Sequence, residues 1–347
     1  EDTEIGYRLY RNGAWFIPVK GAKALHQEPP GGSNETNRTE GREITESQFI
    51  EKCPAKYRPY VEGRTYEVPK VSVYIPAYNC QDFIKEAIDS VLNQTYQDLE
   101  VVVCNDGSTD NTHEILVAYY DGHPQVSILT QENQGISAAT NAAINACRGE
   151  YILQLDADDL LLPNCVASLV DVMDNTDYDI VYGDSHLIGT EREDLGPAYS
   201  WSIYCRIRLL NGMFVHHPRM FRAKVFSRTN GFNTSLTNAV DFDFYLQLSQ
   251  HARGYHLQKP LYLYRQHTTN TSKVNRKEQD NNTRVALERA FSSMGLSDLI
   301  SLVPNSNDVR KLDKKVREEV SDYSLCVKAI HQRLGVRSAT KERFMRW

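Results

Sequence analysis

The sequence predicts an α/β domain with a doubly wound, mostly parallel sheet and helices on both faces. From Val68 onward, short apolar runs rich in Val, Ile and Tyr alternate with segments of helical period. Strands that alternate with helices at this spacing are typical of parallel sheets covered on both faces. Several of the strand-like runs end in polar residues, and ligands of such sheets bind beyond the carboxyl ends of the strands.

The expected elements follow in regular order. Strands are expected over 71–79, 99–107, 126–130, 151–159 and 179–184. Helices are expected over 83–92, from about Asp110, over 136–147 and after Pro163. Beyond Asp184 the pattern is less regular until a helical segment at 241–251, a polar helix over about 277–294 and two helical stretches within 308–347.

Composition narrows the class of protein. The chain has 347 residues, of which 41% are hydrophobic and 24% charged, as in ordinary globular proteins. A net charge of −6 and a pI near 6.0 argue against nucleic acid as a partner. No apolar run reaches the roughly 18 residues that a bilayer span needs. Seven scattered cysteines without a CxxC pair favour reduced thiols in a cytoplasmic protein.

Four parts are expected along the chain. Residues 68–275 carry the alternating pattern, and 276–347 form a helical extension. Residues 31–67, which begin with two glycines directly after two prolines, are interpreted as a linker. Residues 1–30 are interpreted as the tail of an upstream module of the same fold. Their first nine residues resemble 240–248, and each stretch has an aspartate followed 24 or 26 residues later by a histidine.

The C-terminus is locally basic, with Arg333, Arg337, Lys341, Arg343 and Arg346 close together. One interpretation is a solvated helix face. The other is a docking surface for glycan or anionic lipid, which would place the protein peripherally at the inner face of the plasma membrane.

The strongest motif is the acidic run Asp156-Ala157-Asp158-Asp159 after an apolar strand. Carboxylates two positions apart at a strand exit can turn toward one site, where they suit Mn²⁺ or Mg²⁺ bridging a diphosphate. The alternative is an acidic turn that caps a helix or faces solvent.

Three other strand or helix ends complete a candidate nucleotide site. Pro76 and Tyr78 end the first strand, where an aromatic ring can stack on a base, although Tyr78 alone also suits packing. Asp106 ends the second strand, where it can accept hydrogen bonds from uracil or ribose, or belong to a simple glycine turn. Asn133 and Gly135 precede a helix of small residues. The N–H groups at the start of this helix suit phosphate, and the alternative is a glycine turn into a tightly packed helix.

In their order, the segments YIPAYN, NDGSTDN, NQGISAATN and LDADD resemble the family 2 glycosyltransferases over about residues 68–275. The resemblance implies a GT-A fold, a UDP-sugar donor and inversion at the anomeric carbon. It also implies that Tyr78 and Asp106 lie at the nucleoside, and that Asp156 and Asp158 lie at the diphosphate and metal.

The resemblance further supplies a base and a third metal ligand. Inversion by direct displacement needs a base beside the acceptor hydroxyl, and the family's position matches Asp241, with Asp243 as the competing candidate. Capping of the following helix is the alternative role for Asp241. His267 matches the family's metal-ligating histidine, and its neighbour Arg265 is expected to neutralise phosphate.

A narrower resemblance concerns the substrate. The segments LEVVVCNDGSTDNT, HHPRMF and NAVDFDFYLQLS are similar to the second module of bifunctional bacterial synthases of hyaluronan and chondroitin. This implies transfer of glucuronic acid from UDP-glucuronate to the 3-OH of a terminal N-acetylhexosamine on a growing glycan. We expect His216, His217 or Arg219 to contact the donor carboxylate or the acceptor, with core hydrogen bonding as the alternative; Trp201 is a candidate sugar platform, although packing is favoured.

Other functions stay open from the sequence alone. One is a GT-A transferase that uses UDP-GlcNAc, UDP-GalNAc or a UDP-hexose in capsule or O-antigen synthesis. A phosphatase-like fold leaves NDGSTDN unexplained, and a non-catalytic glycan-binding module predicts loss of a carboxylate at 156, 158 or 241, where all three are present.

Overall fold

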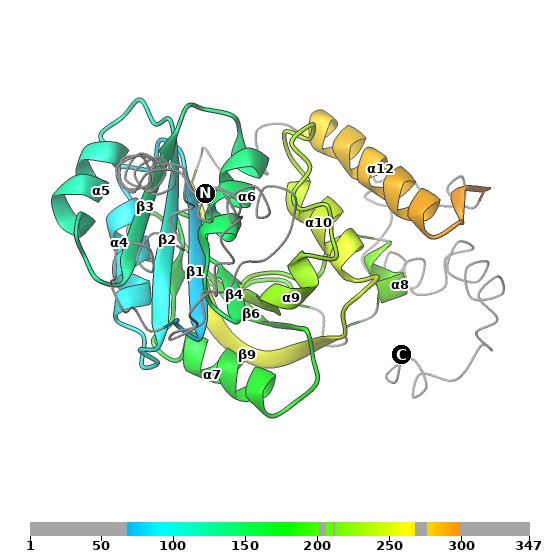
Figure 1. Ribbon diagram of the computed structural model, residues 1–347, viewed down its shortest axis with the longest axis horizontal. Coiled ribbons are helices and arrows are strands. Elements are labelled where there is room, and N and C mark those ends of the chain that lie inside the picture. The colour runs from blue at the N-terminus through cyan, green and yellow to red at the C-terminus, as the bar shows by residue number, and fades with distance from the viewer. Residues whose placement is uncertain (1–67, 201–203, 205, 211, 268–275, 299–347) are drawn as a thin grey trace, which may run out of the picture. The chain divides into compact units, whose positions relative to one another are not determined.

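A nine-stranded mixed sheet forms the centre of the described structure, with strand order β3-β2-β1-β4-β8-β6-β9-β5 and β7 paired to β6. Figure 1 labels β1, β2, β3, β4, β6 and β9 of this sheet. This computed structural model describes residues 68–200, 204, 206–210, 212–267 and 276–298. Residues 1–67, the end of the extension after 298 and Trp201 lie outside the described residues, and so do the expected tail and linker.

The first half of the sheet is parallel, as the alternating sequence predicts. It consists of β1 (Val71–Ala77), β2 (Leu99–Asp106), β3 (Val126–Gln131) and β4 (Tyr151–Gln154). Every residue of β1, β2 and β4 is buried, whereas β3 is a half-buried edge. Continuous burial explains why these strands read as unbroken apolar runs.

Helices cover both faces of this half. The odd-numbered side chains of β1, such as Val73, pack in one core with α4 (Ile84–Leu92), α5 (Thr112–Tyr120) and α7 (Cys165–Asp174). On the other face, Tyr74 packs in a second core with α6 (Ile136–Ala146). Successive strand residues point to opposite faces, which gives the two cores.

The second half of the sheet mixes strand directions. β8 (Arg219–Arg222) runs antiparallel to both β4 and β6 (Ile180–Ile188), and β9 (Gly254–Arg265) runs parallel to β6. Two short strands, β5 (Leu160–Leu161) and β7 (Asp194–Pro197), pair antiparallel with β9 and β6. The expected α/β class is confirmed, and its parallel part is the first half together with the β6–β9 pair.

Among the residues that the structure describes, the less regular part contains four further helices: α8 (Arg206–Leu209), α9 (Ala223–Phe226), α10 (Val240–Leu248) and α12 (Arg276–Ser293). Helices α9, α10 and α12 contribute to the same core as α6, and α10 lies beside α12 (Figure 1). The head of α10 therefore lies on the α6 face of the sheet.

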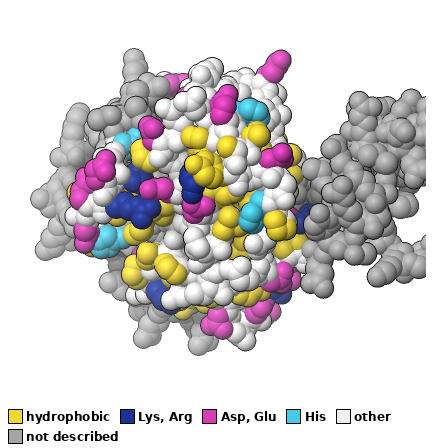
Figure 2. Space-filling model, turned by 90° about the vertical axis from the view of Figure 1, so that its left-hand side faces the viewer, with side chains coloured by type: hydrophobic (Ala, Val, Ile, Leu, Met, Phe, Trp, Pro, Cys, Tyr) yellow, Lys and Arg dark blue, Asp and Glu magenta, His cyan; other side chains and the backbone are white. Residues whose placement is uncertain are grey.

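The surface and the thiols match the composition. On the face seen in Figure 2, acidic and basic side chains are interspersed, without an extended area of one charge. Within the described residues, no helix has both the length and the apolar character to cross a membrane. Four described cysteines are buried free thiols: Cys80, Cys104, Cys147 and Cys165.

Candidate active site

A cleft of about 1040 Å³ opens beyond the carboxyl ends of β1, β2 and β4, with the head of α10 as another wall. Most of the predicted site residues line this cleft, whereas Arg265 and the competing candidate Asp243 do not: those that do are Pro76, Tyr78, Asp106, Asn133, Gly135, Asp156, Asp158, Asp241 and His267. Residues up to 191 positions apart in the sequence, from Pro76 to His267, thus meet around one cavity.

The nucleotide end of the cleft is organised by Asp106. Its Oδ1 accepts hydrogen bonds from Gln131 Nε2 at 2.7 Å and the Gln134 N–H at 3.0 Å, and its Oδ2 accepts from the Gly135 N–H at 2.8 Å. The carboxylate therefore joins the end of β2 to the loop before α6. Tyr78, 49% exposed, leaves its ring open to the cleft.

Gly107 allows this loop to approach β2. Its φ is +66°, and a Cβ at this position would lie 2.7 Å from the Asn133 backbone nitrogen. Such a distance is shorter than real Cβ contacts, and the left-handed conformation favours glycine. The glycine in NDGSTDN therefore serves the packing of the nucleotide-side loop.

The acidic turn leaves β4 at Gln154 and points two carboxylates into the cleft. Asp156 Oδ1 accepts from Gln154 Nε2 at 3.0 Å, and Asp158 Oδ2 lies 2.8 Å from His267 Nε2. Burial raises the pKa of both carboxyl groups, and the charge of Asp156 adds to the rise at Asp158. Desolvated carboxylates so close together favour a bound cation.

The side chains of the acidic turn and His267 are suitable ligands for a hard divalent metal ion. Carboxylate oxygens of Asp156 and Asp158 with one imidazole nitrogen of His267 are ligand types that Mn²⁺ or Mg²⁺ accepts. A second grouping brings ligand atoms of Asp156, Asp159 and His217 within 4.8 Å of one another. In the first set, Asp158 Oδ2 and His267 Nε2 lie 2.8 Å apart, and we favour this pair as ligands. In the second grouping, Asp159 is buried and already accepts from Tyr262 Oη at 2.8 Å and the Arg265 N–H at 2.7 Å.

Arg265 lies behind the acidic turn rather than in the cleft. Its buried guanidinium donates to the carbonyl oxygens of Asp158 at 2.8 Å and Thr190 at 2.7 Å and to Glu86 Oε2 at 2.7 Å. This placement contradicts the prediction that Arg265 contacts phosphate directly. The structure gives Arg265 the role of holding the backbone of the turn.

Asp241 lies in the first turn of α10 and is paired with Arg219. The Arg219 Nη1 lies 3.1 Å from Asp241 Oδ2, and its Nε donates to Gln154 Oε1 at 3.0 Å. Burial alone would raise the pKa of Asp241, but the Arg219 guanidinium, together with His217 and the hydrogen bond from the Phe242 N–H, outweighs burial and leaves this pKa below its usual value. A carboxylate that is ionised at neutral pH and 38% exposed to the cleft can accept a proton.

Asp243, the competing base, points elsewhere. It is buried, does not line the cleft, and accepts from Gln247 Nε2 at 2.8 Å and Arg289 Nη1 at 2.9 Å. Burial raises the pKa of its carboxyl group. Residues two apart on a helix face different sides, so Asp241 is the residue of this pair that faces the cleft.

His216 and His217 line the cleft in neutral form. Burial, aided by the nearby charge of Arg219, lowers the pKa of His216 to about 4 and also lowers the pKa of His217. Since Arg219 is itself bonded to Asp241, none of the three residues carries a charge that is free to pair with a sugar carboxylate. Hydrogen bonding to a sugar is the contact that the two histidines can still make.

Sequence reasoning missed several cleft residues. Gln154 connects the two halves of the site, since its amide contacts both Asp156 and Arg219. Its only signal is a polar residue at the end of an otherwise apolar strand. Tyr199 and two residues of α12, Gln279 and Thr283, also line the cleft and belong to segments without a motif.

Comparison with known proteins identifies the family of the chain. Residues 72–233 match the family described as Glycosyl transferase family 2. The chondroitin synthase of Escherichia coli is 43% identical over 316 residues, which cover 90% of this chain and 46% of that protein. The hyaluronan synthase of Pasteurella multocida is 40% identical over 301 residues, which cover 86% of this chain and 31% of that protein.

A structural comparison supports the fold. The crystal structure of S. aureus TarS in complex with UDP-GlcNAc has a TM-score of 0.56 at 20% identity, covering 73% of this chain and 78% of that chain. The fold and cleft thus define a glycosyltransferase of the GT-A type. The chain belongs to glycosyl transferase family 2, and it spans less than half the length of these two synthases.

Proposed function

We propose that this chain transfers glucuronic acid from UDP-glucuronate to the 3-OH of a terminal N-acetylhexosamine, with inversion and with a divalent cation. The product would be a hyaluronan- or chondroitin-like glycan. The observation that carries the proposal is one cleft that holds both the acidic turn and an ionised Asp241 braced by Arg219. Similarity to synthases of these two polymers over 86–90% of the chain supports the choice of sugar.

The chemistry follows from the positions of the side chains. We assign Tyr78 and Asp106 to the uridine, and Asp156, Asp158 and His267 to the diphosphate; this is supported by the cleft that all five residues line. The oxygen of the acceptor hydroxyl attacks the anomeric carbon, and the bond from this carbon to UDP breaks. Asp241 accepts the proton of the hydroxyl in the same step. Mn²⁺ or Mg²⁺ held by Asp156, Asp158 and His267 would offset the charge of the diphosphate.

We also propose that residues 68–275 form the transferase module and that an upstream module of the same polypeptide works beside it. The partial coverage of the longer relatives supports this organisation, together with the similarity between the first nine residues and 240–248. Peripheral membrane contact through the basic C-terminus is a further part of the proposal, and its residues lie outside the described ones.

A donor panel tests the sugar. The chain is incubated with Mn²⁺, labelled UDP-glucuronate, UDP-GlcNAc, UDP-GalNAc or UDP-glucose, and hyaluronan or chondroitin oligosaccharides that end in N-acetylhexosamine. We expect transfer of glucuronic acid alone, with a β-1,3 bond by NMR. Transfer of GlcNAc, GalNAc or glucose in its place would support the capsule or O-antigen alternative and overturn the proposal.

Metal removal tests the cation. EDTA should abolish transfer, and added Mn²⁺ or Mg²⁺ should restore it. Asp158→Asn should weaken the response to metal, whereas Asp177→Asn, the same change at an exposed position outside the cleft, should not. Full transfer in EDTA would contradict the metal assignment.

A further inference from the structure

Helix α12 is anchored to the segment that carries Asp241. Asn282 Nδ2 donates to Asn238 Oδ1 at 2.8 Å and to Thr237 Oγ1 at 3.1 Å, directly before α10. One face of α12 is buried in the core shared with α10, through Ala286, Leu287, Ala290 and Phe291. A helix fixed in this way can present side chains to the cleft in a constant position.

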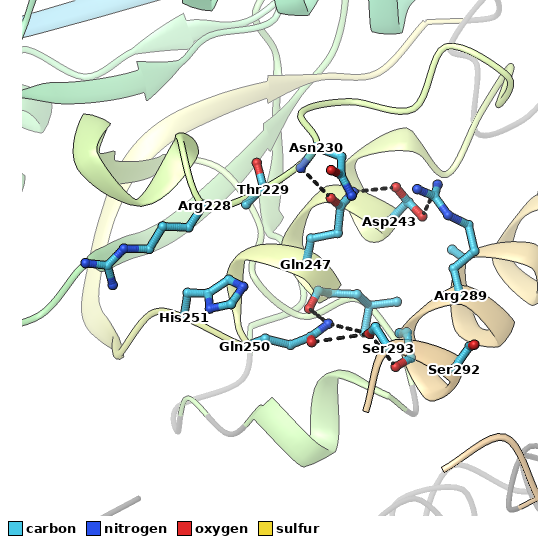
Figure 3. Close-up of a pocket in the computed structure, with 13 residues that line it drawn as sticks. Arg228, Thr229, Asn230, Asp243, Gln247, Gln250, His251, Arg289, Ser292 and Ser293 are labelled. Carbon is cyan, nitrogen blue, oxygen red and sulfur yellow. Dashed lines mark hydrogen bonds and ion pairs between the residues drawn. The ribbon is translucent and has the colours of Figure 1, made fainter. Parts of the chain in front are cut away.

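The far end of α12 is fastened as well. Figure 3 shows Arg289 of α12 directed at Asp243 of α10, at 2.9 Å, and Gln250 bonded to Ser293 at 3.0 Å. These residues line a separate cavity of about 400 Å³ between the two helices. Asp243 thus joins α10 to α12, while Asp241, two residues earlier, faces the catalytic cleft.

The first half of α12 faces the cleft. Gln279 and Thr283 both line it, and residues four apart lie on the same side of a helix. Both side chains are half-buried and uncharged, and they offer an amide and a hydroxyl. Groups of this kind are suited to the hydroxyl and acetamido groups of a sugar.

We infer that α12 forms the acceptor wall of the cleft, and that Gln279 and Thr283 hydrogen-bond the terminal sugar of the acceptor glycan. The inference rests on the proposed function, since it assumes a sugar acceptor. It assigns a role in substrate specificity to a helix that lies outside the 68–275 module and outside the family match at 72–233.

The arrangement of the cleft indicates that Gln279 and Thr283 face the acceptor sugar and not the nucleotide of the donor. The candidate nucleotide residues Tyr78 and Asp106 belong to the ends of β1 and β2, and the acidic turn follows β4. The acceptor hydroxyl must lie within hydrogen-bond reach of Asp241. Since α12 is bonded to residues 237 and 238, directly before α10, its cleft-facing side chains lie on the side of the base.

Acceptor titration tests the inference without relying on the donor sugar. The affinities of the wild type, Gln279→Ala and Thr283→Val for hyaluronan and chondroitin tetrasaccharides ending in N-acetylhexosamine are measured by calorimetry in the presence of UDP and Mn²⁺. Loss of one hydrogen bond should raise the acceptor Kd by about 3- to 10-fold. The Kd of UDP should stay within about twofold, because these side chains lie away from the nucleotide.

Two further variants complete the test. Asn281→Ala changes an exposed neighbour that does not line the cleft, and it should bind the acceptor as the wild type does. Gln279→Glu keeps the size of the side chain but loses the amide donor, so it should also weaken acceptor binding. This variant replaces Gln279→Ala in the test if the alanine variant fails to fold.

An unchanged acceptor Kd in Gln279→Ala and Thr283→Val, or an equal loss of UDP binding, would overturn the inference. Its failure differs from failure of the proposed function. A donor panel that shows transfer of another sugar rejects glucuronate, whereas only the acceptor titration bears on α12.

Discussion

Replacing Arg219 with Leu should disable Asp241 without removing it. In the structure, the Arg219 guanidinium is buried, lies 3.1 Å from Asp241 Oδ2, donates to the Val215 carbonyl at 3.2 Å, and stacks 4.9 Å from the Tyr245 ring centre. Leucine keeps an apolar stem but leaves the carboxylate of Asp241 without its cation.

The size of the effect follows from burial. Removing one partner of a fully buried ion pair costs about 3–5 kcal/mol. Because the Asp241 side chain is 38% exposed, solvent recovers part of this, and we expect a loss of about 2–3 kcal/mol in the free energy of unfolding. A misplaced base typically lowers turnover by about 100-fold, so kcat should fall by that order.

The pH profile supplies a more specific readout. Arg219 holds the pKa of Asp241 below its usual value, so in the wild type the base stays ionised until the pH falls below that range. In Arg219→Leu, the largest interaction that opposes burial is lost, so this pKa should rise. The acid limb of kcat/KM should therefore move to higher pH. For stability, the pairing contributes above the ordinary aspartate pKa of 3.8, and its contribution is lost as the pH falls through the lowered value.

The assay follows UDP release against pH with saturating acceptor. Arg219→Lys keeps the charge without the two-nitrogen geometry and should fall between wild type and Arg219→Leu. Arg228→Leu removes an exposed arginine from the same region and serves as the surface control. An acid limb at the wild-type position, with kcat unchanged, would refute the assignment of Arg219 as the group that positions Asp241. Because Arg219 is paired with Asp241, the KM for UDP-glucuronate should not depend on a contact between Arg219 and the donor carboxylate.

Three further predictions concern neighbouring residues. Asp106→Asn removes a charged acceptor that joins three N–H donors, so the Kd of UDP measured by calorimetry should rise by about 10-fold. Gly107→Ala places a Cβ 2.7 Å from the Asn133 backbone nitrogen and should lower the free energy of unfolding, measured in urea, by about 2 kcal/mol. Asp243→Asn weakens the bond to Arg289 and should lower the melting temperature while kcat falls by less than about 10-fold. A Gly107→Ala protein as stable as wild type, or an inactive but fully stable Asp243→Asn protein, would contradict these roles.

The first half of the fold was predictable because its signals are local. Strands buried on both faces leave continuous apolar runs, and glycines such as Gly107 mark the turns that follow. The second half was not, because β8 enters between β4 and β6 from an irregular stretch, and neither its direction nor its partners leave a periodic pattern. Strand pairing between distant segments depends on packing that sequence periodicity does not encode.

The candidate site shows the same division. Residues in motifs at strand ends, such as Asp106 and Asp158, line the cleft as expected. Arg265 was assigned to phosphate because it is basic and next to His267, yet burial directs its guanidinium to the backbone of the acidic turn. The place of Gln154 and α12 at the cleft could not be predicted from the sequence, because it arises only when distant elements pack together.

The most direct test of the account compares Asp241→Asn with the wild type in two measurements on the same preparation. One is transfer to a hyaluronan or chondroitin oligosaccharide, and the other is the Kd of UDP with Mn²⁺ by calorimetry. If Asp241 is the base, transfer should fall by about 1000-fold while the Kd of UDP stays within about twofold. Transfer within about tenfold of the wild type would show that another group removes the proton, and the central claim would fail.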